Sequence, residues 1–224
     1  MDNNIVSEGK CFFCKKTITQ RGFNKHIGNH LIAMSNDSKG TKRYFHIKFK
    51  AAEMFLQLLV SDSITLDKLD SFIRKIWMEC CGHLSAFTFN KNEIPMSSKL
   101  KTTIIPNTKL EYIYDFGSST KLEVYVYNSY RIDLEEDILL ISRNEPLQIL
   151  CDVCHKEPAL HICTVCTYEV ASFFCEKCGE KHSEDCPDFD DYAKMPVVNS
   201  PRMGTCGYTG GEIDLERDGV FKLK

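Results

Sequence analysis

Eight cysteine and histidine side chains in the last third of the chain form four pairs at near-even spacing. The pairs are Cys151-x2-Cys154, Cys163-x2-Cys166, Cys175-x2-Cys178 and His182-x3-Cys186, and eight residues separate the first pair from the second and the second from the third. Zinc takes four tetrahedral donors and prefers thiolate and imidazole. The spacing therefore predicts two zinc sites.

The four pairs can be distributed over two sites in two ways. In a cross-braced arrangement the first and third pairs bind one ion, and the second and fourth pairs bind the other. In a sequential arrangement the first pair works with the second, and the third with the fourth. The helix-compatible stretch from Lys177 to His182 favours the cross-braced arrangement. Spacing alone decides pairing weakly, so the sequential arrangement stays as the alternative.

The N-terminal part has the spacing of a two-Cys, two-His zinc finger, Cys11-x2-Cys14-x11-His26-x3-His30, one residue short of the usual x12. Ile18 and Phe23 fall where such a finger keeps its small apolar core. His26 and His30 lie one turn apart on a predicted helix, which Gly22 weakens. We expect a third zinc here.

The chain begins with the polar stretch MDNNIVSEGK, which does not have the apolar core of a secretory signal, so we expect a cytoplasmic protein. The sequence also contains twelve cysteines. The cytosol keeps thiols reduced, so clustered cysteines there favour metal over disulfides. The three predicted sites use nine Cys and three His and leave Cys80, Cys81 and Cys206 unassigned. Sites with four protein donors are structural, because catalysis needs an open position for water.

Periodicity predicts the organisation between these motifs. We expect a zinc finger at 9–31, a polar linker at 34–42, an α+β core at 43–148, a double-zinc module at 149–190 and an extended tail at 191–224. The core should contain a small mixed or antiparallel sheet with strands at 44–50, 54–60, 83–90 and 137–142 and a hairpin at 109–128. Its one main helix, at 65–82, has Thr65 as N-cap and Gly82 at its C-terminal end.

The unassigned cysteines allow one enzymatic interpretation. The stretch Cys80-Cys81-Gly-His83 combines a thiol with a base. Buried free thiols at a helix end are the favoured interpretation, because free cysteine is among the most buried residue types. We therefore expect no enzyme activity and no small-molecule substrate.

Charge is distributed unevenly along the chain. Residues 1–50 carry ten Lys and Arg against three Asp and Glu, whereas residues 151–224 carry eight against fourteen. A basic N-terminal part favours a polyanionic partner there. The residues expected to contact nucleic acid are those on the finger helix: Gln20, Arg21, Asn24 and Lys25.

The middle of the chain resembles a known family. The helix motif has Leu69, Asp70, Ile73, Arg74 and Trp77, a strand follows with His83-Leu84-x-x-Phe87, and a turn reads Tyr114-Asp115-Phe116-Gly117-Ser118. Together they resemble the Ri-plasmid open-reading-frame-three-like (plasmid ORF-3-like) family, also found among transposon passengers with resolvase-like labels. The resemblance covers about 43–128, extends to the closing NSPRMGTCGYTG, and implies the same α+β fold but no catalytic residues.

Three functions follow in order of preference. The first is a non-enzymatic protein with structural zinc that binds a protein partner through its acidic C-terminal array, which is similar to MYND and B-box arrays. The second is weak nucleic-acid binding through the finger, since a lone finger reads only about 3 base pairs. An enzyme comes third, because no group of residues meets the geometric requirements of a site. No run of about 18 apolar residues predicts a membrane span.

Overall fold

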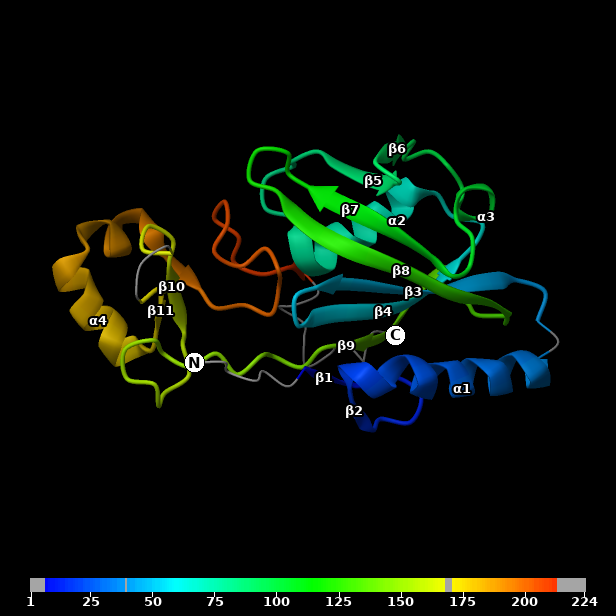
Figure 1. The fold of residues 1–224 in the computed structure, drawn as a ribbon, viewed down its shortest axis with the longest axis horizontal. Coiled ribbons are helices and arrows are strands. Elements are labelled where there is room, and N and C mark those ends of the chain that lie inside the picture. Colours follow the sequence, from blue (N-terminus) through cyan, green and yellow to red (C-terminus); the bar gives the residue numbers. More distant parts are fainter. Residues whose placement is uncertain (1–6, 39, 168–170, 213–224) are drawn as a thin grey trace.

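The computed structural model describes residues 7–38, 40–167 and 171–212. Figure 1 shows a twisted antiparallel sheet with α1 along one face, α2 on the other, and a smaller module to one side. The predicted α+β class is confirmed. The sheet has seven strands in the order β6-β5-β7-β8-β3-β4-β9. Their bounds are β3 Arg43–Ala51, β4 Met54–Ser61, β5 Ser85–Phe89, β6 Asn92–Ile94, β7 Thr108–Tyr114, β8 Thr120–Arg131 and β9 Ile138–Arg143.

The central strand β3 is buried on both faces. Phe45, Ile47 and Phe49 alternate on the face that packs against the core helix. Tyr44 and His46 point to the opposite face, and both are also buried. The His46 ring lies 2.6 Å from Gln57 Oε1, and burial lowers the pKa of His46 to about 4. A neutral histidine is the form that a dry interface accepts.

The core helix α2, Leu66–Ile73, begins where predicted, because the Thr65 hydroxyl caps the backbone N–H of Lys68. It continues as a π-helical turn, η1, over Arg74–Met78 and ends there, four residues before Gly82. The predicted helix at 65–82 was therefore too long. The backbone is already extended at Glu79, so residues 79–83 form a loop instead of a last helical turn. A short helix, α3 Leu100–Thr103, precedes β7.

The second face of the sheet is covered by the finger helix α1, Gln20–Ser38. Phe23, Ile27 and Leu31 are fully buried and share one apolar cluster with side chains of β3, β4 and β8. Residues 34–38, predicted to be part of a polar linker, instead form the last turn of this helix. Met34 still packs against the apolar cluster, and the polar residues that follow it come at the end of the helix.

The finger is also joined to the edge of the sheet. Its two short strands, β1 Glu8–Lys10 and β2 Thr17–Thr19, pair with each other. β1 then bridges the end of β9 through Gly9 and Asn144, and the backbone N–H of Phe12 donates to Ile141 at 2.9 Å. A Cβ at Gly9 would lie 2.6 Å from the Arg143 carbonyl oxygen. Only glycine permits so close an approach.

The C-terminal module has its own three-stranded sheet, in the order β11-β10-β12. The strands are β10 His161–Cys163, β11 Phe173–Phe174 and β12 Lys194–Pro196, and the helices are α4 Glu176–Asp185 and the π-helical turn η2 Phe189–Ala193. The predicted tail at 191–224 thus begins inside this module. Its last part, 213–224, lies outside the described residues. Residues 199–211 form turns that pack on the core, with Ser200, Arg202 and Tyr208 buried.

Because the finger helix α1 packs on the sheet, Ile27→Ala should strongly lower the free energy of unfolding of the core. The side chain is 0% exposed between α1 and the sheet, and truncation of such a residue costs about 2–5 kcal/mol. Urea unfolding followed by tryptophan fluorescence reports on Trp77 in the core, far from the substitution. Its midpoint should fall in Ile27→Ala.

The control is Ile32→Ala on the same helix, where the side chain is 53% exposed. It should change the free energy of unfolding by less than about 0.5 kcal/mol. An unchanged Trp77 transition in Ile27→Ala would mean that the finger is an independent unit.

Candidate metal centres

The finger residues Cys11, Cys14, His26 and His30 lie together, with their donor atoms all within 4.8 Å of one another. Cys11 and Cys14 lie on the turn between β1 and β2, and the histidines project from successive turns of α1. The Cys14 Sγ lies 3.3 Å from His26 Nε2. Burial raises the pKa of Cys11 and lowers that of His26. A neutral imidazole is the form of histidine that binds metal.

The residues predicted to contact nucleic acid have different positions on α1. Arg21 and Lys25 are exposed. The Asn24 side chain turns inward, donates to the Tyr127 hydroxyl at 2.5 Å and accepts from Gln57 Nε2 at 2.8 Å. The Gln20 amide donates to the Glu53 carbonyl at 3.4 Å. Two of the four side chains are therefore engaged with the sheet.

The eight donors of the C-terminal module form two groups. Cys151, Cys154, Cys175 and Cys178 make up one, and Cys163, Cys166, His182 and Cys186 make up the other. The grouping matches the cross-braced prediction and not the sequential one. Helix α4 explains how: Cys175 and Cys178 lie at its N-terminal end, and His182 and Cys186 lie one and two turns later. One helix thus supplies donors to both groups.

Distances within the groups suit a tetrahedral ion. Zinc bonded to sulfur at about 2.3 Å places two thiolates about 3.8 Å apart. Cys154 and Cys175 have their sulfurs 4.0 Å apart, as do Cys166 and Cys186, and Cys166 Sγ lies 3.7 Å from His182 Nε2. A disulfide needs about 2.05 Å between sulfurs. All twelve cysteines are free thiols.

Thiol pKa values in the module show why a cation belongs there. Burial and the neighbouring Cys163 raise the pKa of Cys166 to about 12. At Cys151 burial acts in the same direction, but backbone hydrogen bonds, led by that of Cys154, outweigh it and lower the pKa to about 7. Crowded thiolates repel one another. A divalent cation removes this repulsion and allows all the cysteines to ionise.

Aromatic rings surround one of the two groups. The His182 ring stacks on Phe174 at 4.2 Å between centroids and contacts Phe189 edge-on at 5.0 Å. The apolar cluster of the module consists of few side chains, and Cys163 and Cys166 are among them. So small a core does not fold alone. Metal binding contributes about 10–16 kcal/mol to modules of this kind.

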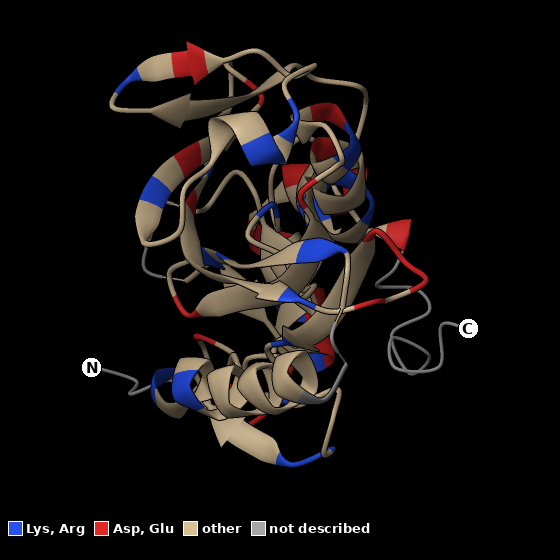
Figure 2. Ribbon diagram, turned by 90° about the vertical axis from the view of Figure 1, so that its right-hand side faces the viewer, with Lys and Arg blue, Asp and Glu red and all other residues tan. Residues whose placement is uncertain are grey.

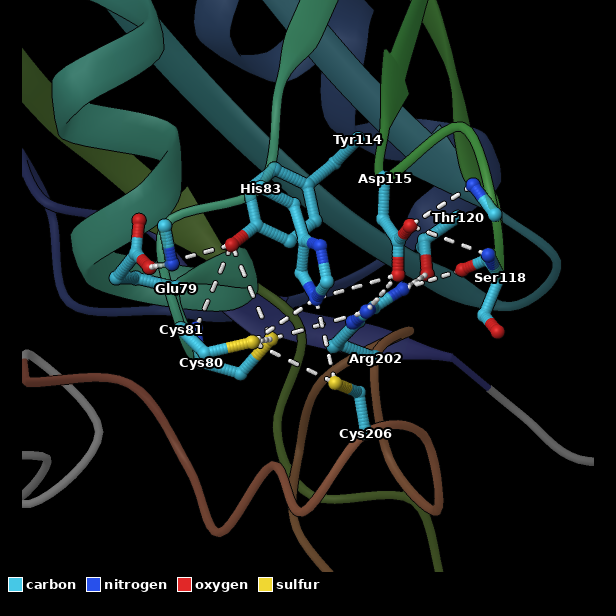
Figure 3. A network of polar contacts seen from close by, with 12 residues as sticks. Glu79, Cys80, Cys81, His83, Tyr114, Asp115, Ser118, Thr120, Arg202 and Cys206 are labelled. Atoms are coloured by element: carbon cyan, nitrogen blue, oxygen red, sulfur yellow. Dashed lines mark hydrogen bonds and ion pairs between the residues drawn. The ribbon is translucent and has the colours of Figure 1, made fainter.

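A fourth group of donors was missed in the sequence: Cys80, Cys81, His83 and Cys206 (Figure 3). The favoured interpretation of Cys80 and Cys81 as buried thiols was wrong for Cys81, which is exposed, whereas Cys80 is half-buried against the core. Cys206 is also exposed. The loop after η1 supplies three of these donors. Cys206 comes from the C-terminal segment, and no spacing rule connects it with the others.

Comparison with known proteins adds little to this geometry. Neither a protein-family model nor a curated protein matches the chain. A solved structure, described as a protein of unknown function, MM3350 from Methanosarcina mazei Go1, aligns at 15% identity over 44% of this chain and 67% of its own, with a TM-score of 0.33. Such a likeness carries no information on function, so the function has to be inferred from the chain's own residues.

The pairing of donors predicts how ions are lost from double variants. Cys151→Ser with Cys175→Ser removes two donors from one group and should cost one ion. Cys151→Ser with Cys163→Ser removes one donor from each group and should cost two. Native mass spectrometry of zinc-loaded protein counts the ions. Sequential pairing would give the reverse result, so the two double variants serve as each other's control.

Proposed function

We propose that this protein is a non-enzymatic, structural-zinc protein that acts as a macromolecular interaction module, and that its C-terminal module binds a protein partner. The donor sets support the structural role of zinc, because each predicted site has four protein donors and therefore no open position for a reaction. Thiolate and imidazole donors favour zinc over calcium or magnesium.

The exposed apolar side chains of the module carry the proposal. Among the described residues of 150–167 and 171–192, five large hydrophobic side chains are exposed: Leu150, Val153, Leu160, Val165 and Tyr192. Val153 and Val165 occupy the same place in two successive metal-binding turns, directly before the second cysteine, and are 54% and 44% exposed. Metal binding thus fixes two apolar side chains at the surface. We propose that these two side chains are anchors for the partner.

Charge indicates the chemistry of the partner. Acidic side chains are exposed along α4 and η2: Glu176, Glu180, Glu184, Asp185, Asp190 and Asp191. A phosphate backbone would be repelled by this surface. A protein segment with apolar anchors flanked by Lys or Arg would be complementary to it.

The resemblance in the middle of the chain remains part of the proposal. We propose that residues 43–128 are related to the plasmid ORF-3-like family. In support, the motif residue Asp70 is buried, accepts from Tyr112 and Ser85 at 2.7 Å each and pairs with Arg74 at 2.8 Å. These side chains connect α2 to β5 and β7, which is a structural role and implies no chemistry.

Partner binding should depend on Val153 and Val165. The full-length, zinc-loaded chain is used as bait for proteins of its own host cell, and each captured protein is tested again in purified form. Val153→Asp with Val165→Asp should weaken binding of the partner by at least about tenfold, since interface anchors contribute 1.4 kcal/mol or more.

The matched control is Ile105→Asp, which changes a side chain that is 68% exposed on the core. It should bind the purified partner like the wild type. A partner that binds the double variant and the wild type equally would contradict the proposed surface.

Nucleic-acid binding is the second candidate, and the exposed Arg21 and Lys25 on α1 favour it. Two basic side chains that follow α1 are engaged within the protein: Lys42 donates to the Leu134 carbonyl and Arg43 pairs with Asp62. On the ribbon in Figure 2, Lys and Arg are interspersed with Asp and Glu. No helix within the described residues is long and apolar enough to cross a membrane.

Few phosphate contacts predict a shallow salt dependence. Each contact contributes about −0.9 to the slope of log K against log salt, so Arg21 and Lys25 alone give a slope near −2. Fluorescence anisotropy with a labelled DNA duplex from about 50 mM salt upward measures it. A steep dependence of the affinity on salt, together with loss of binding in the double variant Arg21→Ala with Lys25→Ala, would instead make nucleic acid the primary partner.

A further inference from the structure

The fourth group of donors has the geometry of a metal site. Cys81 Sγ lies 3.0 Å from His83 Nε2 and 3.6 Å from Cys206 Sγ, and His83 Nε2 lies 3.2 Å from Cys206 Sγ. Cys80 and Cys81 have their sulfurs 3.8 Å apart. These distances resemble those in the three predicted groups and the value of about 3.8 Å for two thiolates on one zinc. Figure 3 shows the three sulfurs and the imidazole nitrogen converging.

The backbone around Cys206 has the form of the other metal-binding turns. In two of those turns the residue after the second cysteine has a positive φ, 62° at Lys15 and 54° at His155. Gly207, directly after Cys206, has a φ of 67°, and Cys206 itself has a φ of 52°. A positive φ at a residue with a side chain costs of order 1–3 kcal/mol and persists only where the surroundings require it. Metal ligation by Cys206 would be such a requirement.

The segment that carries Cys206 is anchored close to the other three donors. Arg202 is fully buried, pairs with Asp115 at 2.5 Å and lies over the Tyr114 ring. Its Nη2 also donates to Cys80 Sγ at 3.7 Å. Three thiolates, one neutral imidazole and a divalent ion have a net charge of −1. The Arg202 guanidinium, whose own charge is balanced by Asp115, supports this arrangement by its hydrogen bond to one of the sulfurs, as outer groups around metal sites commonly do.

Exposure distinguishes this group from the other three. Cys81 and Cys206 are exposed, whereas none of the donors in the predicted sites is. Water and chelators therefore reach an ion here more easily. The donors also come from parts of the chain that are 125 residues apart, so an ion would connect the C-terminal segment to the core.

We propose that Cys80, Cys81, His83 and Cys206 form a fourth zinc site that clamps the C-terminal segment to the core and exchanges its ion faster than the three predicted sites. The fourth site is separate from the interaction role proposed above, because its donors lie on the core and its C-terminal segment and not on the C-terminal module.

The test counts ions and follows their release from the full chain. Native mass spectrometry of reduced, zinc-loaded wild type should show four ions, and Cys206→Ala should show three. With a colorimetric zinc chelator in excess, about a quarter of the zinc of the wild type should leave in a separate fast phase. That phase should be absent in Cys206→Ala. Amide hydrogen exchange at 199–208 should become faster in this variant, while exchange in α4 stays unchanged.

Two further variants separate loss of a ligand from loss of the fold. Cys206→Asp keeps a donor at a backbone conformation that Asp tolerates and should retain four ions, with the fast phase accelerated. Thr205→Ala changes the neighbouring residue and should behave like the wild type. Three ions in the wild type, or four in Cys206→Ala, would overturn the proposal. So would a mass two hydrogens lower for wild type prepared without reductant, if Cys206→Ala lacks this difference, because that would show a disulfide at Cys206.

Discussion

Both faces of the central sheet carry large apolar side chains, and the rest of the molecule is arranged to cover them. α2 and the π-helical turn η1 cover one face with apolar side chains that include Leu69, Ile73 and Trp77. The other face depends on α1, whose stripe of Phe23, Ile27 and Leu31 is only three side chains long. Helices of ordinary length are marginal without tertiary contacts. A metal ion bound by the donors of α1 and of the adjoining turn between β1 and β2 would therefore also stabilise the packing of α1 on the sheet.

Local spacing made much of the structure predictable. The sequences of β3, β7 and β8 alternate with period two, β4 and β9 are short apolar runs, and turn residues around Asp115 mark the hairpin. These elements lie where the sequence predicts them. The three C-x2-C pairs of the C-terminal module and the pair His182-x3-Cys186 are equally local signals. The cross-braced pairing of these donors depends on one helix, α4, which supplies donors to both groups. The sequence already favoured this pairing.

Long-range relations could not be obtained in that way. The burial of Tyr44 and His46 depends on a helix from another motif, and no property of β3 itself reveals this cover. The early end of the core helix depends on contacts that Glu79 makes with Arg74, Gly82 and the Tyr114 hydroxyl. Cys206 is far in sequence from Cys80, Cys81 and His83. It lies near them because Arg202 pairs with Asp115 and so anchors its segment to the core. One signal was available: three cysteines remained after the ligand count, and His83 lies beside two of them.

The chain crosses between the core and the C-terminal module twice, and the two crossings are tied together. The Asn144 and Asn199 side chains are hydrogen-bonded to each other at 2.7 Å, Asn199 also donates to the Asn144 carbonyl, and Arg143 donates to the carbonyl of Asn199. In topological terms residues 149–196 are an insertion whose two ends meet at a single buried joint. An insertion whose two ends lie close together can be replaced by another one without distorting the domain that carries it. The core can therefore accept a different inserted module at the same two connections, either in evolution or by design.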